Sequence, residues 1–464
     1  MMSCNRAIAF AALLLASINA SATNFAVTRT DDPFPNGCQA NDCSLREAVI
    51  TANALSGTDR IILAAGIYHL TLAGNGSDNS NAGDLDVDSD IEIVGAGAAS
   101  TTILGENSSR IFDVGVGGSL LLRRLTLDHG RDDSGDGGDG GGAILQNGAL
   151  AIEDAVISGS QTTFVGGAIY NISGSETVLR RVQLLNNSAD LGGGAFSGNS
   201  GVLLVDSIVS GNSGGAFDGG GGIHGCARVY RSLIQNNHTT GDGGGIRAEG
   251  CSGISMEVHE STIASNTAVN GGGFYALYPF VVELSTFSGN AASGAGGGIY
   301  IDDGEPSGST AKVLSSTLYL NTALDGSAVL FNDSQYTPNF LITFQNTLVS
   351  GTCERFGAGA NYIDGVLGNL QSPGHGCGFG GPFPNGTFST YDVPAENLKL
   401  GALGNNGGPT PTHLPQAGSA AIGTGWQLAC EKLDQRGYVR TGCDVGAAEA
   451  GALNDVIFRT GNDY

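Results

Sequence analysis

The chain has 464 residues, of which 77 are glycine, and Asp plus Glu outnumber Lys plus Arg by 44 to 20. The net charge of −24 argues against nucleic acid or an anionic membrane as a partner, because both bind basic faces. With 41% hydrophobic but only 7% aromatic residues, the chain is too apolar for disorder and suits thin, regular packing.

Residues 1–22 have the pattern of a secretory signal peptide. Arg6 precedes an apolar run from Ala7 to Ile18, and Ala20-Ser21-Ala22 supplies the small-residue cleavage site. Because no other apolar run reaches the roughly 18 residues of a membrane span, we expect a secreted or cell-surface protein with no transmembrane segment. We also expect it to be a monomer.

Removal of the signal leaves eight cysteines, an even number in an oxidising compartment. Their proximity along the chain predicts four disulfides, Cys38–Cys43, Cys226–Cys251, Cys353–Cys377 and Cys430–Cys443. Metal binding is the alternative, but the spacing that metal sites favour is missing.

A glycine pair followed by an apolar residue recurs about every 26 residues, since six steps separate Gly142 from Gly298. An asparagine keeps the same period, and apolar residues lie three and eight positions before it. The asparagines are Asn187, Asn212, Asn237, Asn266, Asn290 and Asn321.

Such a period indicates stacked units that bury their apolar faces only against one another. The segments between the marks are short, β-branched and alternating, as in Val281–Phe287, which is typical of strands. A unit of this length, divided into two or three strands, predicts an all-β, right-handed parallel β-helix of the pectin-lyase-like type. A propeller is the alternative, but its blades need about 40 residues or more.

We expect three regions after the signal peptide. Residues 23–59 form an N-terminal cap, in which Cys43–Val49 is a short helix with Ser44 as N-cap and Glu47 completing a capping box. Residues 60–352 form the repeats. Residues 353–464 form the C-terminal end of the β-helix and a Gly/Pro-rich segment that seals it.

Three sets of residues resemble bacterial families. Cys43-Ser44-Leu45-Arg46-Glu47-Ala48 resembles the signature of CSLREA-domain secreted proteins, and the Gly-Gly-Ala-Ile marks resemble the β-helical repeats of polymorphic outer-membrane adhesins. Four stretches near the C-terminus resemble the choice-of-anchor Q domain, which caps many exported β-helices. They are Asn406–His413, Gly418–Ile422, Asp434–Gly437 and Cys443–Gly446. These resemblances imply a capped, exported β-helix and no settled activity.

The densest carboxylate cluster lies in the Gly-rich stretch between Arg131 and Gly142. Its members are Asp132, Asp133, Asp136 and Asp139. A solvated insertion between coils is our first interpretation, and a calcium site or a calcium-plus-arginine lyase site is the alternative. No cofactor is required, and calcium is the only one that the sequence suggests.

Two further patterns bear on ligands. The carboxylates of Asp84, Asp86, Asp88 and Asp90 alternate along what reads as one strand, so all four are expected to face outward. In the aromatic stretch Phe274–Phe280, a core ladder and turn is our first interpretation, because Phe274 and Phe280 fall at stacked apolar positions. The alternative is that Tyr275 and Tyr278 are exposed rings that stack on sugars.

No convergent catalytic set accompanies the repeat, so no catalytic residue is assigned. We expect a non-catalytic β-helix for adhesion or contact with an extracellular polysaccharide or a cell-surface glycan or protein. The alternative is an extracellular polysaccharide lyase or glycoside hydrolase on the same fold. The charge of −24 favours a neutral glycan over a polyanion, unless calcium bridges the two.

Overall fold

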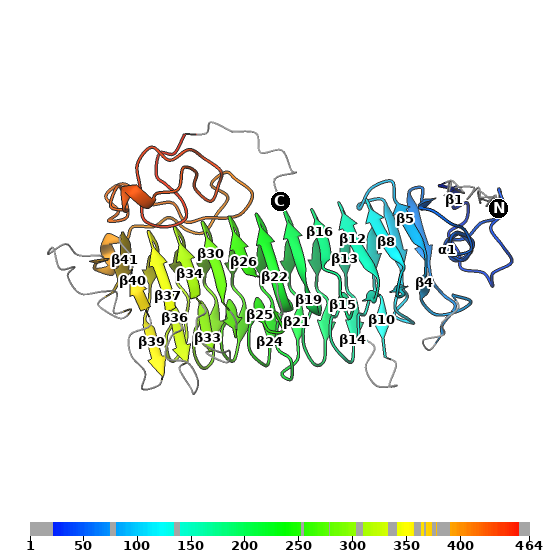
Figure 1. The fold of residues 1–464 in the computed structure, drawn as a ribbon, viewed down its shortest axis with the longest axis horizontal. Helices are drawn as coiled ribbons and strands as arrows, with labels where there is room; N and C mark the ends of the chain where they lie inside the picture. The colour runs from blue at the N-terminus through cyan, green and yellow to red at the C-terminus, as the bar shows by residue number, and fades with distance from the viewer. Residues whose placement is uncertain are drawn as a thin grey trace, which may run out of the picture.

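The computed structural model describes residues 22–74, 80–133, 140–251, 255–277, 279–302, 310–332, 341–356, 363–365, 368–373, 377 and 390–453. Strands lie side by side along the long axis of the molecule, from helix α1 (Leu45–Asn53) at one end to β41 (Asn369–Ser372) at the other (Figure 1). The predicted signal peptide, except Ala22, lies outside the described residues.

Strands pair with those of neighbouring coils in parallel register and form three long sheets. The first sheet has 22 strands: β1 (Asn24–Ala26), β2 (Asp59–Ile62), β4 (Leu85–Val87), β5 (Asp90–Val94), β7 (Phe112–Val114), β8 (Ser119–Arg123), β11 (Ile144–Gln146), β12 (Ala149–Glu153), β15 (Ile169–Asn171), β16 (Thr177–Arg180), β19 (Phe196–Val205), β22 (Ile223–Tyr230), β25 (Ile246–Ala248), β26 (Met256–His259), β29 (Phe274–Ala276), β30 (Phe280–Glu283), β33 (Ile299–Asp302), β34 (Thr310–Leu314), β36 (Val329–Asn332), β37 (Leu341–Gln345), β39 (Cys353–Phe356) and β40 (Ile363–Gly365).

The second sheet has 13 strands: β3 (Gly66–His69), β6 (Thr101–Leu104), β9 (Thr126–Asp128), β13 (Val156–Ser158), β17 (Gln183–Leu185), β20 (Ile208–Ser210), β23 (Leu233–Gln235), β27 (Thr262–Ala264), β31 (Thr286–Ser288), β35 (Thr317–Tyr319), β38 (Leu348–Ser350), β41 and β42 (Thr390–Asp392). The third has seven: β10 (Arg131–Asp132), β14 (Gln161–Thr162), β18 (Ser188–Ala189), β21 (Ser213–Gly214), β24 (His238–Thr239), β28 (Thr267–Ala268) and β32 (Ala291–Ala292).

The fold is therefore the predicted parallel β-helix, and its coils carry three strand segments, as in β19–β21, or four, as in β15–β18. In the coil β15–β18, two residues with left-handed backbones, Arg181 and Asn186, make tight corners on either side of β17. These corners cut what the sequence pattern suggests is one strand into separate segments. The chain then passes from the first sheet to the second and third within a few residues.

The apolar ladders confirm that equivalent side chains stack in single columns. Leu204 pairs in register with Leu179 on one side and Val229 on the other, and Val229 pairs with Val258. A second column runs through Leu184, Val209, Ile234, Ile263, Phe287 and Leu318. All of these side chains are almost fully buried, so each coil completes the core of the next.

The recurring asparagines form a hydrogen-bonded ladder between the second and third sheets. The Nδ2 of Asn212 donates to the carbonyl of Leu184 at 3.0 Å and to the Oδ1 of Asn237 at 2.9 Å. Its own Oδ1 accepts from the backbone N–H of Asn187 at 2.9 Å. Because these side chains are buried, the ladder satisfies groups that water cannot reach.

The glycines of the marks are required by backbone geometry. Gly166 has a φ of 71°, and a Cβ there would lie 2.3 Å from the carbonyl oxygen of Ile169. At the second glycine, a Cβ on Gly167 would lie 2.1 Å from the carbonyl oxygen of Gly194 in the next coil. Larger residues would therefore push successive coils apart.

Helix α1 packs against β2, β4 and β5 of the first coils (Figure 1). Ser44 is its N-cap, and Glu47 completes the predicted capping box. Arg46 is fully buried and holds both oxygens of Asp32, at 2.7 and 3.0 Å. Its remaining N–H groups donate to the carbonyls of Ser80, Gly83 and Asp84, which lie near β4.

All four predicted disulfides are present. Cys226 and Cys251 join β22 to the segment between β25 and β26 of the following coil, with a Cα–Cα distance of 5.2 Å. The other three are Cys38–Cys43, Cys353–Cys377 and Cys430–Cys443.

From residue 393 on, the described C-terminal residues lie beside the last coils (Figure 1), and the predicted sealing of the solenoid end by residues 353–464 stays a prediction. Residues 393–453, which include the 3-10 helices η1 (Ala395–Asn397) and η2 (Gln427–Ala429), lie along the flank of the last coils (Figure 1). They cover the outer face of β27, β31, β35 and β38, where the hydroxyls of Thr262, Thr286 and Thr317 hydrogen-bond to them. We call residues 393–453 the flank segment. The outward hydroxyls on successive rungs provide the surface on which it docks.

Candidate functional site

One outward-facing side chain from each coil forms a straight column on the first sheet. Each member directly follows a Gly-Gly-apolar mark, and consecutive members pair in register. We call this set the outward column: Leu145, Tyr170, Ser197, His224, Arg247, Tyr275, Tyr300 and Leu330. Neighbouring rungs of a sheet lie about 4.8 Å apart, so the column presents one side chain per rung.

The C-terminal half of the outward column is closed. Tyr275 and Tyr300 stack with ring centroids 4.8 Å apart, and only 7% and 8% of each residue is exposed. The Tyr275 hydroxyl donates to Asp302 at 3.0 Å, and Leu330 is fully buried beside the pair. The buried ring of Tyr275 agrees with our first interpretation of this stretch as a core ladder, and both faces of the ring lie against neighbouring side chains. The alternative, an exposed platform for sugars at Tyr275, is not what the structure shows, and Tyr278 lies outside the described residues.

Burial also controls the chemistry of these tyrosines. It raises the pKa of Tyr275 far above its ordinary value, with a further contribution from the negative charge of Asp302. Burial and Asp302 likewise raise the pKa of Tyr300 to about 12. Both phenols therefore stay protonated at physiological pH.

The middle of the outward column is partly open, because Tyr170, His224 and Arg247 are partly exposed, although Ser197 between them is buried. Tyr170 is partly exposed, and its ring meets Phe164 edge-on at a centroid distance of 6.0 Å. Next come Ser197 and His224, whose Oγ and Nδ1 atoms lie 3.1 Å apart. Arg247 follows, with its guanidinium 5.6 Å from the centroid of the Tyr275 ring.

Glu249 is the carboxylate that faces this part of the column. Its Oε2 lies 2.9 Å from Nη2 of Arg247 and 3.7 Å from Nε2 of His224. The pKa of Glu249 lies below its ordinary value. Contact with His224 lowers it most and Arg247 lowers it further, while burial acts in the opposite direction. The site thus combines an aromatic edge, a hydroxyl, an imidazole and a guanidinium on four consecutive rungs.

The aspartate row is not the exposed strand that we expected. Asp86 lies on the outer face of β4, in register with Asp113 of β7. Asp84 and Asp86 are nevertheless buried, because Arg110 and Ser80 cover their carboxylates. Asp84 accepts from Nε of Arg110 at 2.9 Å, and Asp86 accepts from the hydroxyl of Ser80 at 3.0 Å. Only Asp88 and Asp90 are exposed.

Asp86 nevertheless borders an acidic pocket of about 210 Å³, together with Asp88, Asp113, Gly115 and Asn147. Asp86 and Asp113 are in register on neighbouring strands, β4 and β7. Burial, and then the charge of Asp84, raises the pKa of Asp86 to about 6. This carboxyl therefore changes its protonation state in mildly acidic solution.

The predicted aspartate cluster is only partly described. Asp132 is buried and accepts from the hydroxyl of Thr162 at 3.1 Å, whereas Asp133 pairs with Arg131 at 2.7 Å. Asp136 and Asp139 lie outside the described residues. Among the residues that the structure describes, no group of three or more His, Cys, Asp or Glu side chains is placed to hold a metal ion. Calcium binding by this cluster stays a prediction.

A second ionisable cluster connects the first sheet with the flank segment. His259 stacks on Tyr230, and its Nδ1 lies 3.2 Å from Oε2 of Glu283. Contact with His259 lowers the pKa of Glu283, whereas burial and Glu283 raise the pKa of Glu431 on the flank segment. This arrangement favours a proton shared between the two glutamates.

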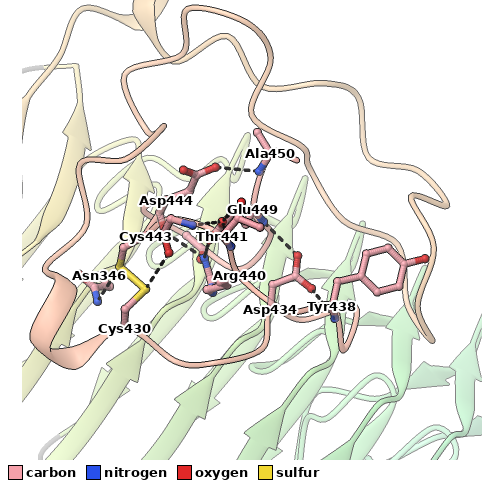
Figure 2. Close-up of polar contacts among 12 residues, drawn as sticks. Asn346, Cys430, Asp434, Tyr438, Arg440, Thr441, Cys443, Asp444, Glu449 and Ala450 are labelled. Atoms are coloured by element: carbon pink, nitrogen blue, oxygen red, sulfur yellow. Dashed lines mark hydrogen bonds and ion pairs between the residues drawn. A yellow bond between two sulfur atoms is a disulfide. The ribbon is translucent and has the colours of Figure 1, made fainter. Parts of the chain in front are cut away.

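The motif residues of the flank segment hold its own loops together (Figure 2). Arg440 is buried and reaches the backbone carbonyls of Asp444 and Gly446, while Oε1 of Glu449 accepts the backbone N–H groups of Thr441 and Gly442. The buried carboxylate of Asp434 pairs with Arg436 at 2.6 Å. These charged groups are engaged in structural contacts.

Comparison with known proteins shows little likeness in sequence. No family model matches the chain, and no curated protein matches it. Among solved structures, the Azotobacter vinelandii mannuronan C-5 epimerase AlgE6 A-module aligns over 75% of this chain and all of its own, at 15% identity and a TM-score of 0.43. That score is too low to support a functional argument. No helix in the described part of the chain is long and apolar enough to span a membrane.

The outward column can be recognised in the sequence by the residue that follows each mark. The residue after each Gly-Gly-apolar mark reads Leu, Tyr, Ser, His, Arg, Tyr, Tyr and Leu from coil to coil, while the mark itself stays nearly constant. Because side chains alternate along a strand, the residue after a buried apolar one faces outward. The outward position that varies from coil to coil in a regular repeat therefore shows which functional groups the outer face presents.

Proposed function

We propose that this protein is an extracellular β-helix scaffold that binds an extended glycan along the open part of the outward column. The observation that carries the proposal is the register of Tyr170, Ser197, His224 and Arg247, which follow one another on four consecutive coils. Such a column offers an aromatic ring and polar groups at regular spacing. A linear polymer can follow these groups without bending.

The four disulfides suit an extracellular setting, because such bonds persist in oxidising compartments. The long stack of coils also suits a scaffold. Each coil contacts mainly its neighbours, so outer positions can change in chemistry while the core column stays apolar.

The test is binding of the full mature chain to a panel of neutral and acidic polysaccharides by affinity electrophoresis. Tyr170→Ala is expected to weaken binding about three- to tenfold, because ring contacts contribute about 0.5–1.5 kcal/mol. Phe34→Ala is the matched control, since Phe34 is 73% exposed and belongs to the N-terminal cap. Equal binding by the wild type and Tyr170→Ala would remove the outward column as the contact site.

A second candidate function, polysaccharide cleavage, is favoured by the acidic pocket. Its two rung-adjacent carboxyls include one, Asp86, with a pKa of about 6, a property that suits a general acid. An assay for reducing ends and unsaturated products on the same panel tests it. Turnover that disappears in Asp86→Asn would put cleavage ahead of passive binding.

A further inference from the structure

The guanidinium of Arg247 is used differently from those of Arg46 and Arg231. Arg46 and Arg231 each present their Nε and Nη2 atoms together and hold both oxygens of one carboxylate, at 2.7 and 3.0 Å in each case. This two-point grip is the strong mode of arginine–carboxylate recognition. Arg247 presents the same edge, but only Nη2 has a partner, the Oε2 of Glu249 at 2.9 Å.

Two buried nitrogens at this place have no hydrogen-bond partner among the described residues. One is Nε of Arg247, and the other is Nε2 of His224 on the preceding rung. The distance of 3.7 Å from His224 Nε2 to Glu249 is too long for a hydrogen bond. Glu249 therefore faces three nitrogens and forms an ion pair at close range with one of them, Nη2 of Arg247.

A buried donor without a hydrogen-bond partner destabilises the folded state by about 1–3 kcal/mol, and by more if the group is charged. Glu249 covers the two unpartnered nitrogens with a side chain that is itself 42% exposed. A carboxylate that approached along the Nε/Nη2 edge would fill both positions on Arg247 and come within reach of His224. The geometry is that of a carboxylate site partly filled by the protein's own side chain.

We infer that Arg247 and His224 bind the carboxylate of an acidic sugar, which takes the place of Glu249. The inference rests on the proposed glycan contact and names the ligand's class. The flanking rungs, Ser197 and Tyr275, are uncharged. The site therefore suits a glycan with isolated carboxylates better than a continuous polyanion, which the net charge of −24 would repel.

The experiment compares two forms of one ligand by isothermal titration calorimetry with the full mature chain. The first is a xylo-oligosaccharide that carries a single glucuronic acid, and the second is the same oligosaccharide with its carboxyl group reduced to an alcohol. We expect the acidic form to bind at least about tenfold more tightly, because only it can fill the Arg247 edge. Free glucuronate is titrated separately, to distinguish a glycan site from a site for any small carboxylate.

Three variants sharpen the comparison. Arg247→Gln is expected to abolish the preference for the acidic form. Glu249→Gln is expected to strengthen binding of that form, because it removes the competing carboxylate, and this gain is independent of any loss of folding. Arg231→Gln is the control, because its partner Asp206 lies at a different corner of the coil.

The outcomes separate the two proposals. Equal binding of the acidic and reduced forms, or a preference that survives in Arg247→Gln, overturns the carboxylate site and leaves the glycan contact standing. Binding of free glucuronate that depends on Arg247, with no binding of either oligosaccharide, supports the carboxylate site and rejects the glycan scaffold. No binding of any of the three ligands overturns both.

Discussion

The two terminal regions of the molecule protect the solenoid in different ways. At the N-terminal end, α1 and the buried Arg46 lie against the first coils and continue the apolar core through Leu45, Ala48 and Val49. At the other end, the flank segment lies beside the stack. It covers the outer face of the second sheet through hydroxyl and amide groups, and through an apolar cluster that joins Leu348 and Leu370 to Leu398, Ala421 and Val445.

This difference shows that the two motif-bearing regions have different structural tasks. The N-terminal cap shields the edge and core of the first coils, so its loss exposes apolar surface and unpaired strand groups. The flank segment covers a face whose apolar side is already buried inside the coils. Its loss is expected to leave a folded solenoid.

The largest expected effect is at the N-terminal cap. Arg46→Ala leaves Asp32 buried without its partner and removes the donors to three carbonyls, so we expect the free energy of unfolding to fall by about 3–5 kcal/mol. Urea denaturation followed by circular dichroism measures it. Arg60→Ala is the control and should cost no more than about 1 kcal/mol, because the Arg60 side chain is 47% exposed. Equal losses in both variants would contradict the role assigned to Arg46.

A smaller and more local effect is expected at the flank segment. Gln435 is fully buried and hydrogen-bonds to the hydroxyls of Thr262, Thr286 and Thr410. Gln435→Leu should weaken docking by about 2–3 kcal/mol, with little change in the main unfolding transition.

Hydrogen exchange measures the weaker docking of the flank segment in Gln435→Leu, which should appear as faster amide exchange in residues 434–449. Gln183→Leu, an exposed residue in register on the uncovered part of the same sheet, serves as control. If Gln435→Leu shifts the main transition as much as Arg46→Ala does, the flank segment is part of the cooperative core.

The smallest effect concerns pH near the N-terminal cap. The pKa of Asp86 is about 6 in the folded protein and about 3.9 in an unfolded chain, so the folded state holds this proton more tightly. The contribution to stability is complete below about pH 4 and is lost as the pH rises through about 6. Melting temperatures at pH 4, 5, 6 and 7 should decline less in Asp86→Asn than in the wild type. Identical pH profiles would show that Asp86 is not the responsible group.

Most of the fold could be predicted because a period of about 26 residues repeats the same physical requirement in every coil. Apolar side chains such as Leu204 and Val229 stack, and asparagines such as Asn212 hydrogen-bond to the next coil at a corner. Glycines such as Gly166 adopt a positive φ where a side chain would clash. The four disulfides were predicted from the proximity of the cysteines along the chain. Cys226 and Cys251, for example, are one coil apart.

The candidate site was harder to predict, because it depends on which side chains lie next to one another across coils. The sequence left an exposed ring at Tyr275 as an alternative, yet that ring is enclosed by Tyr300 and Arg247, which come from other coils. Asp84 and Asp86 looked exposed, yet Arg110 and Ser80 cover their carboxylates. Neither Arg247 nor His224 carried a motif.

The amino-acid sequence by itself determined the parallel β-helix, the helical N-terminal cap and the pairing of the cysteines, because each depends on local pattern and period. Only the tertiary structure decided where the flank segment lies, which outward residues stay open and which nitrogens of Arg247 and His224 lack partners. These features depend on distances between coils and on loops that fold over them, and no repeat period encodes such distances.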